Sequence, residues 1–473
     1  MCHSGRAQGA RGPEEGAQMR DLRKGARRTL ATVGAFALAA GAAIADPGPE
    51  PQDAKPAPAA ETKKAEALPT TMKLGTTTWT LYGFVEASLA YNDSRMNSIR
   101  LPGVVLAESP GGGAIGHNKG DFAMWARTSR LGISMVADSI GVLMDAVPSA
   151  ALEFDFLGGG VGTAAFPLNE AVTPIRIRKA YVRLKKSLED AGWMALQLGQ
   201  DWEVISPLRP GINEETYMWG VGNAGGFRPH LRAEMLYKVG EGIGLVAQLG
   251  LGVTGAQDQV DLDANGTTDG EASEYPNFQF RGGVDMDLIE GAQQPMRAGA
   301  WIHKHWQETD VFIGGRKRFH GWGWGLDFSL SLLPMGGDMK RDQVYVNAEF
   351  YWGANLSDIR GGTQGGLFPG RTAGPGSGKN ITEVGWWAEG GFAINESLIV
   401  LAGLGASDPE SEGLPAGSVS NNRAFWAGLK YDVAPVLIGL ELVYWETRYT
   451  APGTPRHSLG NNNRIHIYFR YAF

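Results

Sequence analysis

The stretch NRIHIYFRYAF, residues 463–473, has the alternating pattern of a β-strand. Successive side chains of a strand point to opposite faces, so its residues separate into two sets. One face is apolar and carries Ile465, Ile467, Phe469, Tyr471 and Phe473. The opposite face carries Arg464, His466, Tyr468, Arg470 and Ala472. A soluble sheet and a membrane barrel both fit this one stretch, so the rest of the sequence must decide between them.

The same alternation recurs along most of the chain, as in GWGWGLDFSLSLL (321–333) and VYVNAEFYWG (344–353). The less apolar face is polar and rich in glycine, and aromatic residues gather toward strand ends. This combination is typical of a barrel with lipid outside, aromatic girdles at both interfaces and water within. We expect sixteen strands, beginning near residues 78, 122, 150, 174, 192, 228, 241, 276, 296, 321, 342, 380, 397, 421, 435 and 463.

The links between these segments alternate in length. Those after even-numbered strands are mostly short, such as LEDAG, VGEG, INES and DVAP, whereas those after odd-numbered strands are long. One link, 137–149, is longer than this pattern predicts. The chain is therefore predicted to be all-β: a transmembrane antiparallel β-barrel of about 16 strands, with short periplasmic turns and long extracellular loops. The last strand must pair with the first, because closure leaves no strand edge in the bilayer.

The front of the chain is predicted to direct export. Residues 1–45 contain a basic segment, an apolar segment and an Ala43-Ile44-Ala45 cleavage site, so we expect a signal peptide with its true start at Met19. Residues 46–76 are rich in Pro and Ala and are expected to form a periplasmic tether, followed by the barrel at 77–473. The body contains no long apolar run, which excludes a helical membrane protein. Cys2 is the single cysteine, so no disulfide framework is expected.

The charge balance bears on partners. Residues 1–45 hold 7 Lys/Arg and 3 Asp/Glu of the chain's 43 and 50, which leaves 36 against 47 in the exported part, a net charge of −11. This acidity argues against a nucleic-acid partner. Outer-membrane lipid is the partner that the barrel pattern predicts.

Several stretches resemble trimeric porins of the Gram-negative outer membrane, and among them the DcaP-like (dicarboxylate-type) porins. They include LYGFVEASLAYNDSR (81–95), ARTSRLGISM (126–135) and LQLGQDWEVISPL (196–208). The resemblance implies a homotrimer in the cell outer membrane that passes small hydrophilic solutes by passive diffusion, with a preference for anions or carboxylates. It also implies that the loop at 201–227 folds inward as a constriction. The aromatic C-terminal strand resembles the signal that the barrel assembly machinery reads.

Strand register predicts which charged residues line the pore: Arg130, Arg176, Arg178, Arg232, Arg281, Arg464, Arg470, Glu153, Asp155, Glu349 and Glu441. A basic wall facing an acidic wall would orient and select small ions. The alternative is that these residues pair with one another and only stabilise the wall, with Glu153 and Asp155 between Arg130 and the pair Arg176 and Arg178. The last two are the strongest candidates for contact with solute. The strand after Arg178 breaks register, which indicates a bulge.

Two further groups could hold metal. In the loop 261–271, Asp261, Asp263, Asn265 and Asp269 match positions 1, 3, 5 and 9 of a calcium loop, although Ala272 stands where a glutamate is expected. A merely acidic, solvated loop fits equally well. His303 and His305 point the same way, but no carboxylate lies at ligand spacing, which favours a hydrogen-bonding role over metal binding. No other cofactor is expected.

Catalysis is not expected. The histidines are scattered, and the chain contains no G-x-S-x-G motif, so no residue is predicted to be catalytic. Two alternatives to an open pore remain: a barrel enzyme of lipase or protease type, and a sealed structural barrel. The many glycines on the inner face argue against sealing, because they leave room inside.

Overall fold

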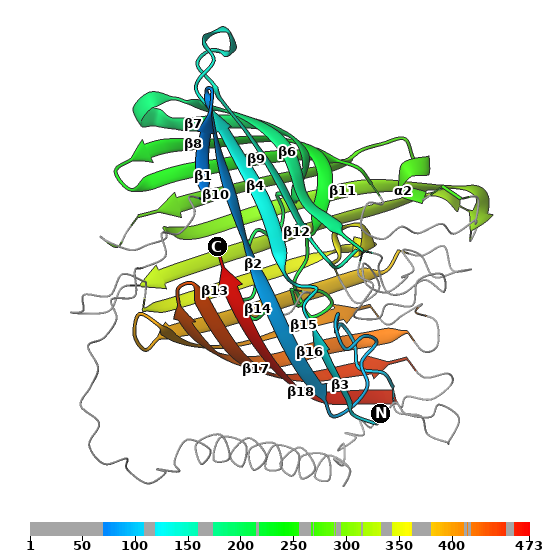
Figure 1. Ribbon diagram of the computed structural model, residues 1–473. Coiled ribbons are helices and arrows are strands. Elements are labelled where there is room, and N and C mark those ends of the chain that lie inside the picture. Colours follow the sequence, from blue (N-terminus) through cyan, green and yellow to red (C-terminus); the bar gives the residue numbers. More distant parts are fainter. Residues whose placement is uncertain are drawn as a thin grey trace, which may run out of the picture. The chain divides into compact units, whose positions relative to one another are not determined.

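The computed structural model describes residues 70–107, 119–158, 174–213, 217–254, 266–267, 269–287, 289, 295–313, 316–332, 343–361, 380–410, 414, 418–450 and 458–473. The predicted signal peptide and nearly all of the predicted tether lie outside this part. The described residues belong to one unit, Pro69–Phe473, and form a single antiparallel sheet (Figure 1).

The first half of the sheet contains β1 (Thr71–Leu74), β2 (Thr77–Asn92), β3 (Asp121–Trp125), β4 (Arg130–Ala137), β5 (Val147–Asp155), β6 (Arg176–Ser187), β7 (Gly192–Trp202), β8 (Phe227–Gly240) and β9 (Ile243–Gly252). The second half contains β10 (Asn277–Met286), β11 (Met296–Ile313), β12 (Arg316–Leu332), β13 (Val344–Ala354), β14 (Thr382–Ala393), β15 (Leu398–Pro409), β16 (Val419–Val433), β17 (Val436–Tyr449) and β18 (Ser458–Ala472). The short helices are η1 (Gly141–Leu143), η2 (Glu189–Ala191), η3 (Leu356–Ile359) and α2 (Asp269–Ala272). None of the helices within these described ranges is long and apolar enough to cross a bilayer.

The sheet closes on itself, as the prediction requires. The last strand, β18, pairs with β2 from Arg464 opposite Asn92 to Ala472 opposite Phe84. Strands β3 and β4 pair with successive parts of β2 and so occupy one position around the barrel. The four-residue β1 pairs with Thr77–Thr80 of β2, a part of that strand that β18 does not reach. Sixteen positions result, and the predicted starts of all sixteen strands lie within a few residues of the observed ones.

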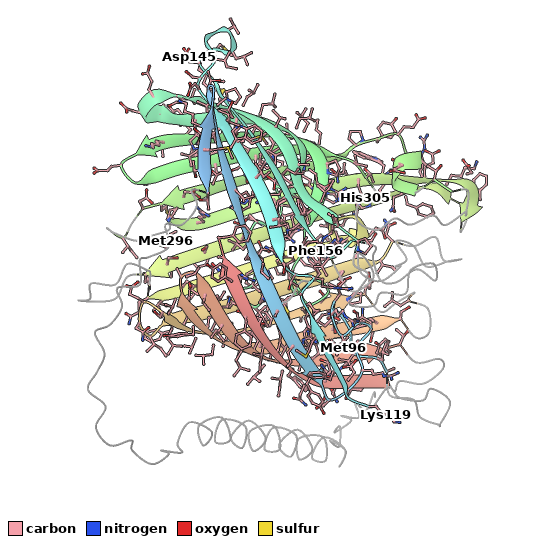
Figure 2. All side chains as sticks on the ribbon, in the orientation of Figure 1. Met96, Lys119, Asp145, Phe156, Met296 and His305 are labelled. Carbon is pink, nitrogen blue, oxygen red and sulfur yellow. The ribbon has the colours of Figure 1, made fainter. Side chains whose placement is uncertain are left out.

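Short turns join the strands at one end of the barrel. Strands β8 and β9 reverse at Glu241–Gly242, and β16 and β17 reverse at Ala434–Pro435. The longer link at 138–146 is a hairpin tip that contains η1 and extends β4 and β5 beyond their neighbours, with Asp145 at its end (Figure 2). Its length therefore does not disturb the barrel.

Strands β18 and β12 show the predicted difference between the two faces. On β18, Phe469 and Tyr471 are exposed on the outside, as is Phe473 just after it, whereas Arg464 and His466 are buried within. On β12, Trp324, Leu326 and Phe328 face outward, and Asp327 lies buried on the inner face. An apolar outer face and a polar inner face are what a barrel in a bilayer needs, since its inter-strand hydrogen bonds already satisfy the backbone.

A bulge on β6 accounts for the predicted break in register. Lys179 pairs with Glu153 and Ile177 pairs with Phe154, so Arg178 is the extra residue between them. Arg178 is buried inside the barrel, while Val182 beyond the bulge is exposed outside. The bulge therefore places Arg178 and Lys179 side by side on the inner face and keeps Val182 on the lipid face.

Candidate pore and the inward-folded loop

The loop between β7 and β8 crosses the inside of the barrel, as the resemblance predicted. We call residues 203–226 the pore loop, described here at 203–213 and 217–226. Its backbone N–H groups donate to carboxylates on distant strands: Leu208 to Glu349 Oε1 (2.9 Å), Gly211 to Glu389 Oε1 (2.8 Å) and Asn213 to Glu441 Oε1 (2.6 Å). These acceptors lie on β13, β14 and β17, so the loop has left its own side of the barrel.

We call Glu349, Glu389 and Glu441 the anchoring wall. Each carboxylate has further donors: Trp387 Nε1 donates to Glu349 at 3.2 Å, and Trp426 Nε1 donates to Glu389 at 2.8 Å. His466 Nδ1 lies 3.2 Å from Glu441 Oε2. All three carboxylates are buried, and an unsatisfied buried acceptor would be costly. The loop and the wall thus satisfy each other's polar groups.

Apolar contacts hold the pore loop against the same strands. Its Ile212, Met218 and Val221 pack in one buried cluster with Trp387 and Trp426. Its Gly222 donates its N–H to Ser407 Oγ at 3.0 Å and has a φ of +100°. A Cβ at Gly222 would lie 2.0 Å from the carbonyl oxygen of Trp386, so only glycine allows the loop to approach β14 this closely.

On strands β4, β6 and β8 the inner face is basic. We call Arg130, Arg176, Arg178, Arg183 and Arg232 the arginine wall. Tyr217 of the pore loop accepts hydrogen bonds from Arg130 (2.8 Å) and Arg178 (2.9 Å) through its hydroxyl. The pore loop therefore contacts both the anchoring wall and the arginine wall.

Carboxylates lie beneath most of these arginines. Asp155 pairs with Arg176 at 2.6 Å and with Arg178 at 3.0 Å, and Arg178 also pairs with Glu153 at 2.8 Å. A second set follows the same plan, because Glu234 pairs with both Arg183 and Arg232. Ion pairs between neighbouring strands therefore exist here, which is the arrangement that the alternative to solute contact predicted.

Burial within these pairs is unequal. The Asp155 side chain is 0% exposed while its partner Arg176 is 24% exposed. Glu234 is 4% exposed while Arg183 is 24% exposed. Arg178, in contrast, is as buried as its acids, at 2%. Solvent inside the barrel thus reaches part of the Arg176 and Arg183 side chains, while their carboxylate partners are covered.

The remaining predicted pore residues also lie on the inner face in polar contacts. Arg281 forms a buried pair with Asp327 at 2.5 Å, and Arg464 donates to the Ile99 carbonyl at 2.8 Å. Arg470 pairs with the fully buried Glu86 at 2.6 Å and stays partly exposed. Arg281 and Arg464 are buried, so their contacts are with the barrel wall and not with the lumen. Contact of any of these residues with solute stays a prediction.

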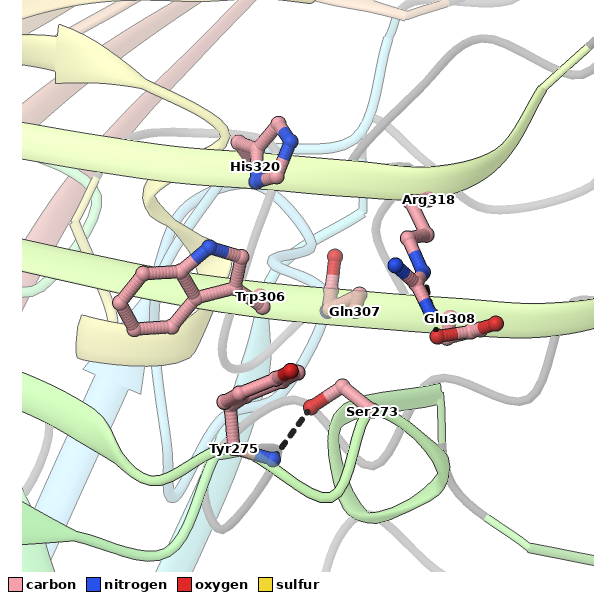
Figure 3. Close-up of a pocket in the computed structure, with 7 residues that line it drawn as sticks. All are labelled: Ser273, Tyr275, Trp306, Gln307, Glu308, Arg318 and His320. Carbon is pink, nitrogen blue, oxygen red and sulfur yellow. Dashed lines mark hydrogen bonds and ion pairs between the residues drawn. The ribbon is translucent and has the colours of Figure 1, made fainter.

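The predicted calcium loop cannot be placed, because Asp261, Asp263 and Asn265 lie outside the described residues. Asp269 is the first residue of α2. Near α2, Ser273, Tyr275, Trp306, Gln307, Glu308, Arg318 and His320 line a cavity of about 170 Å³ (Figure 3). Its Arg318–Glu308 pair, at 2.8 Å, joins β11 to β12. We assign no solute to this cavity.

The sequence did not predict one cluster of two histidines and an aspartate. Asp358 of η3 lies near His303 and His305, although no carboxylate stands at ligand spacing along the chain. Burial alone would raise the pKa of Asp358, but the Arg228 guanidinium, 3.1 Å away, outweighs it and holds that pKa well below its usual range. No local sequence signal marks Asp358, because η3 reaches the histidines only through tertiary folding.

A closed antiparallel barrel of sixteen positions, apolar outside and crossed inside by a loop, is the architecture of outer-membrane porins. No protein-family model matches the chain, and no curated protein matches it. The outer-membrane channel DcaP of Acinetobacter baumannii is similar in structure, with a TM-score of 0.61 and 15% identity over 86% of this chain and 100% of that one. The chain has the fold of that channel.

Two other solved structures are less similar. OmpT, an outer-membrane protein of Vibrio cholerae, has a TM-score of 0.48 at 12% identity, covering 85% of this chain and 99% of that one. The anion-selective porin from Comamonas acidovorans has a TM-score of 0.47 at 12% identity, covering 84% of this chain and 100% of that one. At these identities the likeness to DcaP carries the fold alone.

Proposed function

We propose that this protein is an outer-membrane porin that passes small hydrophilic anions, carboxylates among them, by passive diffusion. The observation that carries the proposal is the unequal burial of its inner ion pairs. Carboxylates such as Asp155, Glu234 and Glu86 are covered, while their arginine partners keep exposed surface. A lumen whose accessible charge is positive concentrates anions and repels cations.

The pore loop supports a narrowed rather than a sealed lumen. It is fixed along β13, β14 and β17, and among its described residues Tyr217 contacts the arginine wall. The exposed surface of Arg176 and Arg183 requires water beside the arginine wall. We infer that solutes pass between this wall and the loop, and that binding and release there involve no bond making or breaking.

A homotrimer in the outer membrane completes the proposal, as the resemblance to trimeric porins implies. The outer face is apolar, with residues such as Leu326 and Phe469 exposed, which supports a barrel surrounded by lipid. The C-terminal aromatic face, which pairs into the closing seam, is the part that we expect the barrel assembly machinery to recognise.

Single-channel recording of the purified protein in a planar bilayer tests this function. We expect stable conductance steps that close in groups of three. Folding is checked separately by the heat-dependent migration of the barrel on gels. A folded barrel that gives no conductance would reject the diffusion pore and favour a sealed or enzymatic barrel.

A further inference from the structure

Two histidines and an aspartate meet inside the barrel at a place that the proposed pore does not use. His303 and His305 lie on the inner face of β11, and Asp358 lies in η3, which follows β13. All three side chains are buried. Figure 2 shows His305 well along β11 from Met296, the first residue of that strand.

The three facing atoms have the spacing of metal ligands. His303 Nε2 lies 3.0 Å from His305 Nδ1 and 3.6 Å from Asp358 Oδ2, and His305 Nδ1 lies 3.9 Å from the same oxygen. A circle through three points at these distances has a radius of about 2.0 Å with its centre inside the triangle, and zinc binds histidine nitrogen and carboxylate oxygen at about 2.0–2.2 Å. One ion at that centre would reach all three ligands without moving them.

Neighbouring residues position two of the three groups. Asn277 Nδ2 donates to Asp358 Oδ2 at 3.1 Å. Gly321 leaves room for the His305 ring, because a Cβ there would lie 1.7 Å from its Cε1 atom. Outer partners that orient ligands in this way are typical of metal sites.

The charge of Arg228 does not exclude a cation. Arg228 pairs with Asp358 through Oδ1, whereas the histidines face Oδ2. The same guanidinium also pairs with the buried Glu203, so two carboxylates share its positive charge. The face of Asp358 that is turned to the histidines therefore keeps electron density to offer a metal.

We propose that His303, His305 and Asp358 bind one divalent transition-metal ion of the zinc class. Two imidazole nitrogens and one carboxylate oxygen suit zinc, cobalt or nickel, whereas calcium and magnesium prefer oxygen ligands alone. The ion would join β11 to the segment that contains η3. Gly225 of the pore loop donates its N–H to Ile359 O of that segment at 2.6 Å, so the ion would also secure the base of the pore loop.

The 3.0 Å separation of the two imidazole nitrogens also fits a direct hydrogen bond between the rings. Metal uptake separates the two arrangements. We would purify the full protein without a histidine tag, strip it with a chelator, refold it with and without Co²⁺, and measure bound metal and the visible d–d absorption. The expected result is one bound ion per chain.

Two variants and a matched control locate the ion. His303→Gln and His305→Gln should each weaken Co²⁺ binding by at least about tenfold, the lower end of what removing even an outer partner of a metal site costs. His466→Gln removes another buried histidine of the inner face and should bind as the parent does. Failure to take up metal even during refolding, or uptake that both ligand variants leave unchanged, would overturn the site.

Discussion

The anchoring wall and the arginine wall both use buried carboxylates, but for different ends. On β13, β14 and β17, Glu349, Glu389 and Glu441 accept backbone N–H groups from the pore loop. On β5 and β8, Asp155 and Glu234 accept from Arg176 and Arg183, which keep exposed surface toward the lumen. The first arrangement fixes a loop and the second presents positive charge to water. A buried acid that accepts backbone N–H groups therefore fixes structure, whereas one that pairs with an exposed arginine contributes to ion selectivity.

Arg178 and Arg176 test this contrast within one wall, since both pair with Asp155 and differ in exposure. Arg178→Gln should lower the free energy of unfolding by about 3–5 kcal/mol, because it leaves the buried Glu153 without its closest partner and removes one of the two arginines on Asp155. Arg176→Gln should cost much less, since water can replace its contacts. Urea unfolding of both variants in lipid vesicles measures the difference, and equal losses would remove the distinction between the two arginines.

Gly222 tests the close approach of the pore loop to β14. Gly222→Ala should displace the loop, because the backbone at φ +100° costs about 1–3 kcal/mol for other residues and the new Cβ would clash with Trp386 O. We expect faster proteolysis within 203–226 and a larger single-channel conductance. Gly240→Ala is the control, as a Cβ there meets nothing within 4 Å. Identical behaviour of the two variants would contradict the packing of the loop.

Glu349 tests the anchoring wall itself. Glu349→Gln should weaken the loop by about 1–3 kcal/mol, because the new amide turns a donor toward groups that also donate. Hydrogen exchange of the Leu208 amide should accelerate accordingly. Glu308→Gln, which breaks the exposed pair with Arg318, should cost little stability and leave that amide unchanged. An unaffected Leu208 amide in Glu349→Gln would show that the carboxylate does not hold the loop.

The smallest effect is expected for the predicted calcium loop at 261–271. If Asp261, Asp263, Asn265 and Asp269 bind calcium, then calcium should raise the melting temperature of this loop relative to chelator. Asp261→Asn with Asp263→Asn should abolish that difference, because the site loses two of its carboxylates. A parent loop that melts at the same temperature in calcium and in chelator would exclude the site.

The sequence alone predicted the barrel well, because each membrane strand has a local pattern of alternating apolar and polar residues. Alternation on β18 and β12 marked the lipid face, and the register break after Arg178 marked the bulge on β6. Barrel closure followed from the need to leave no strand edge in lipid.

Only part of the site could be predicted, because it depends on contacts between residues far apart in the chain. Register tells which face a residue occupies, but not whether Asp155 lies beneath Arg176 or beside it. The contacts of the pore loop with Glu349 and Glu389, and of Asp358 with His303, join residues far apart in the chain. Composition also did not predict ion selectivity, since acids and bases on the inner face are nearly balanced in number. The accessible charge differs from the total charge, because acids such as Asp155 are more deeply buried than their arginine partners.

The reversal potential of the open channel in a potassium chloride gradient tests the central claim most directly. If exposed arginines above buried carboxylates set the charge of the lumen, the parent channel should prefer chloride. Arg176→Gln and Arg232→Gln should each reduce that preference, while the buried Arg281→Gln should change it least. A channel that prefers potassium, or one whose preference ignores all three substitutions, would contradict the account.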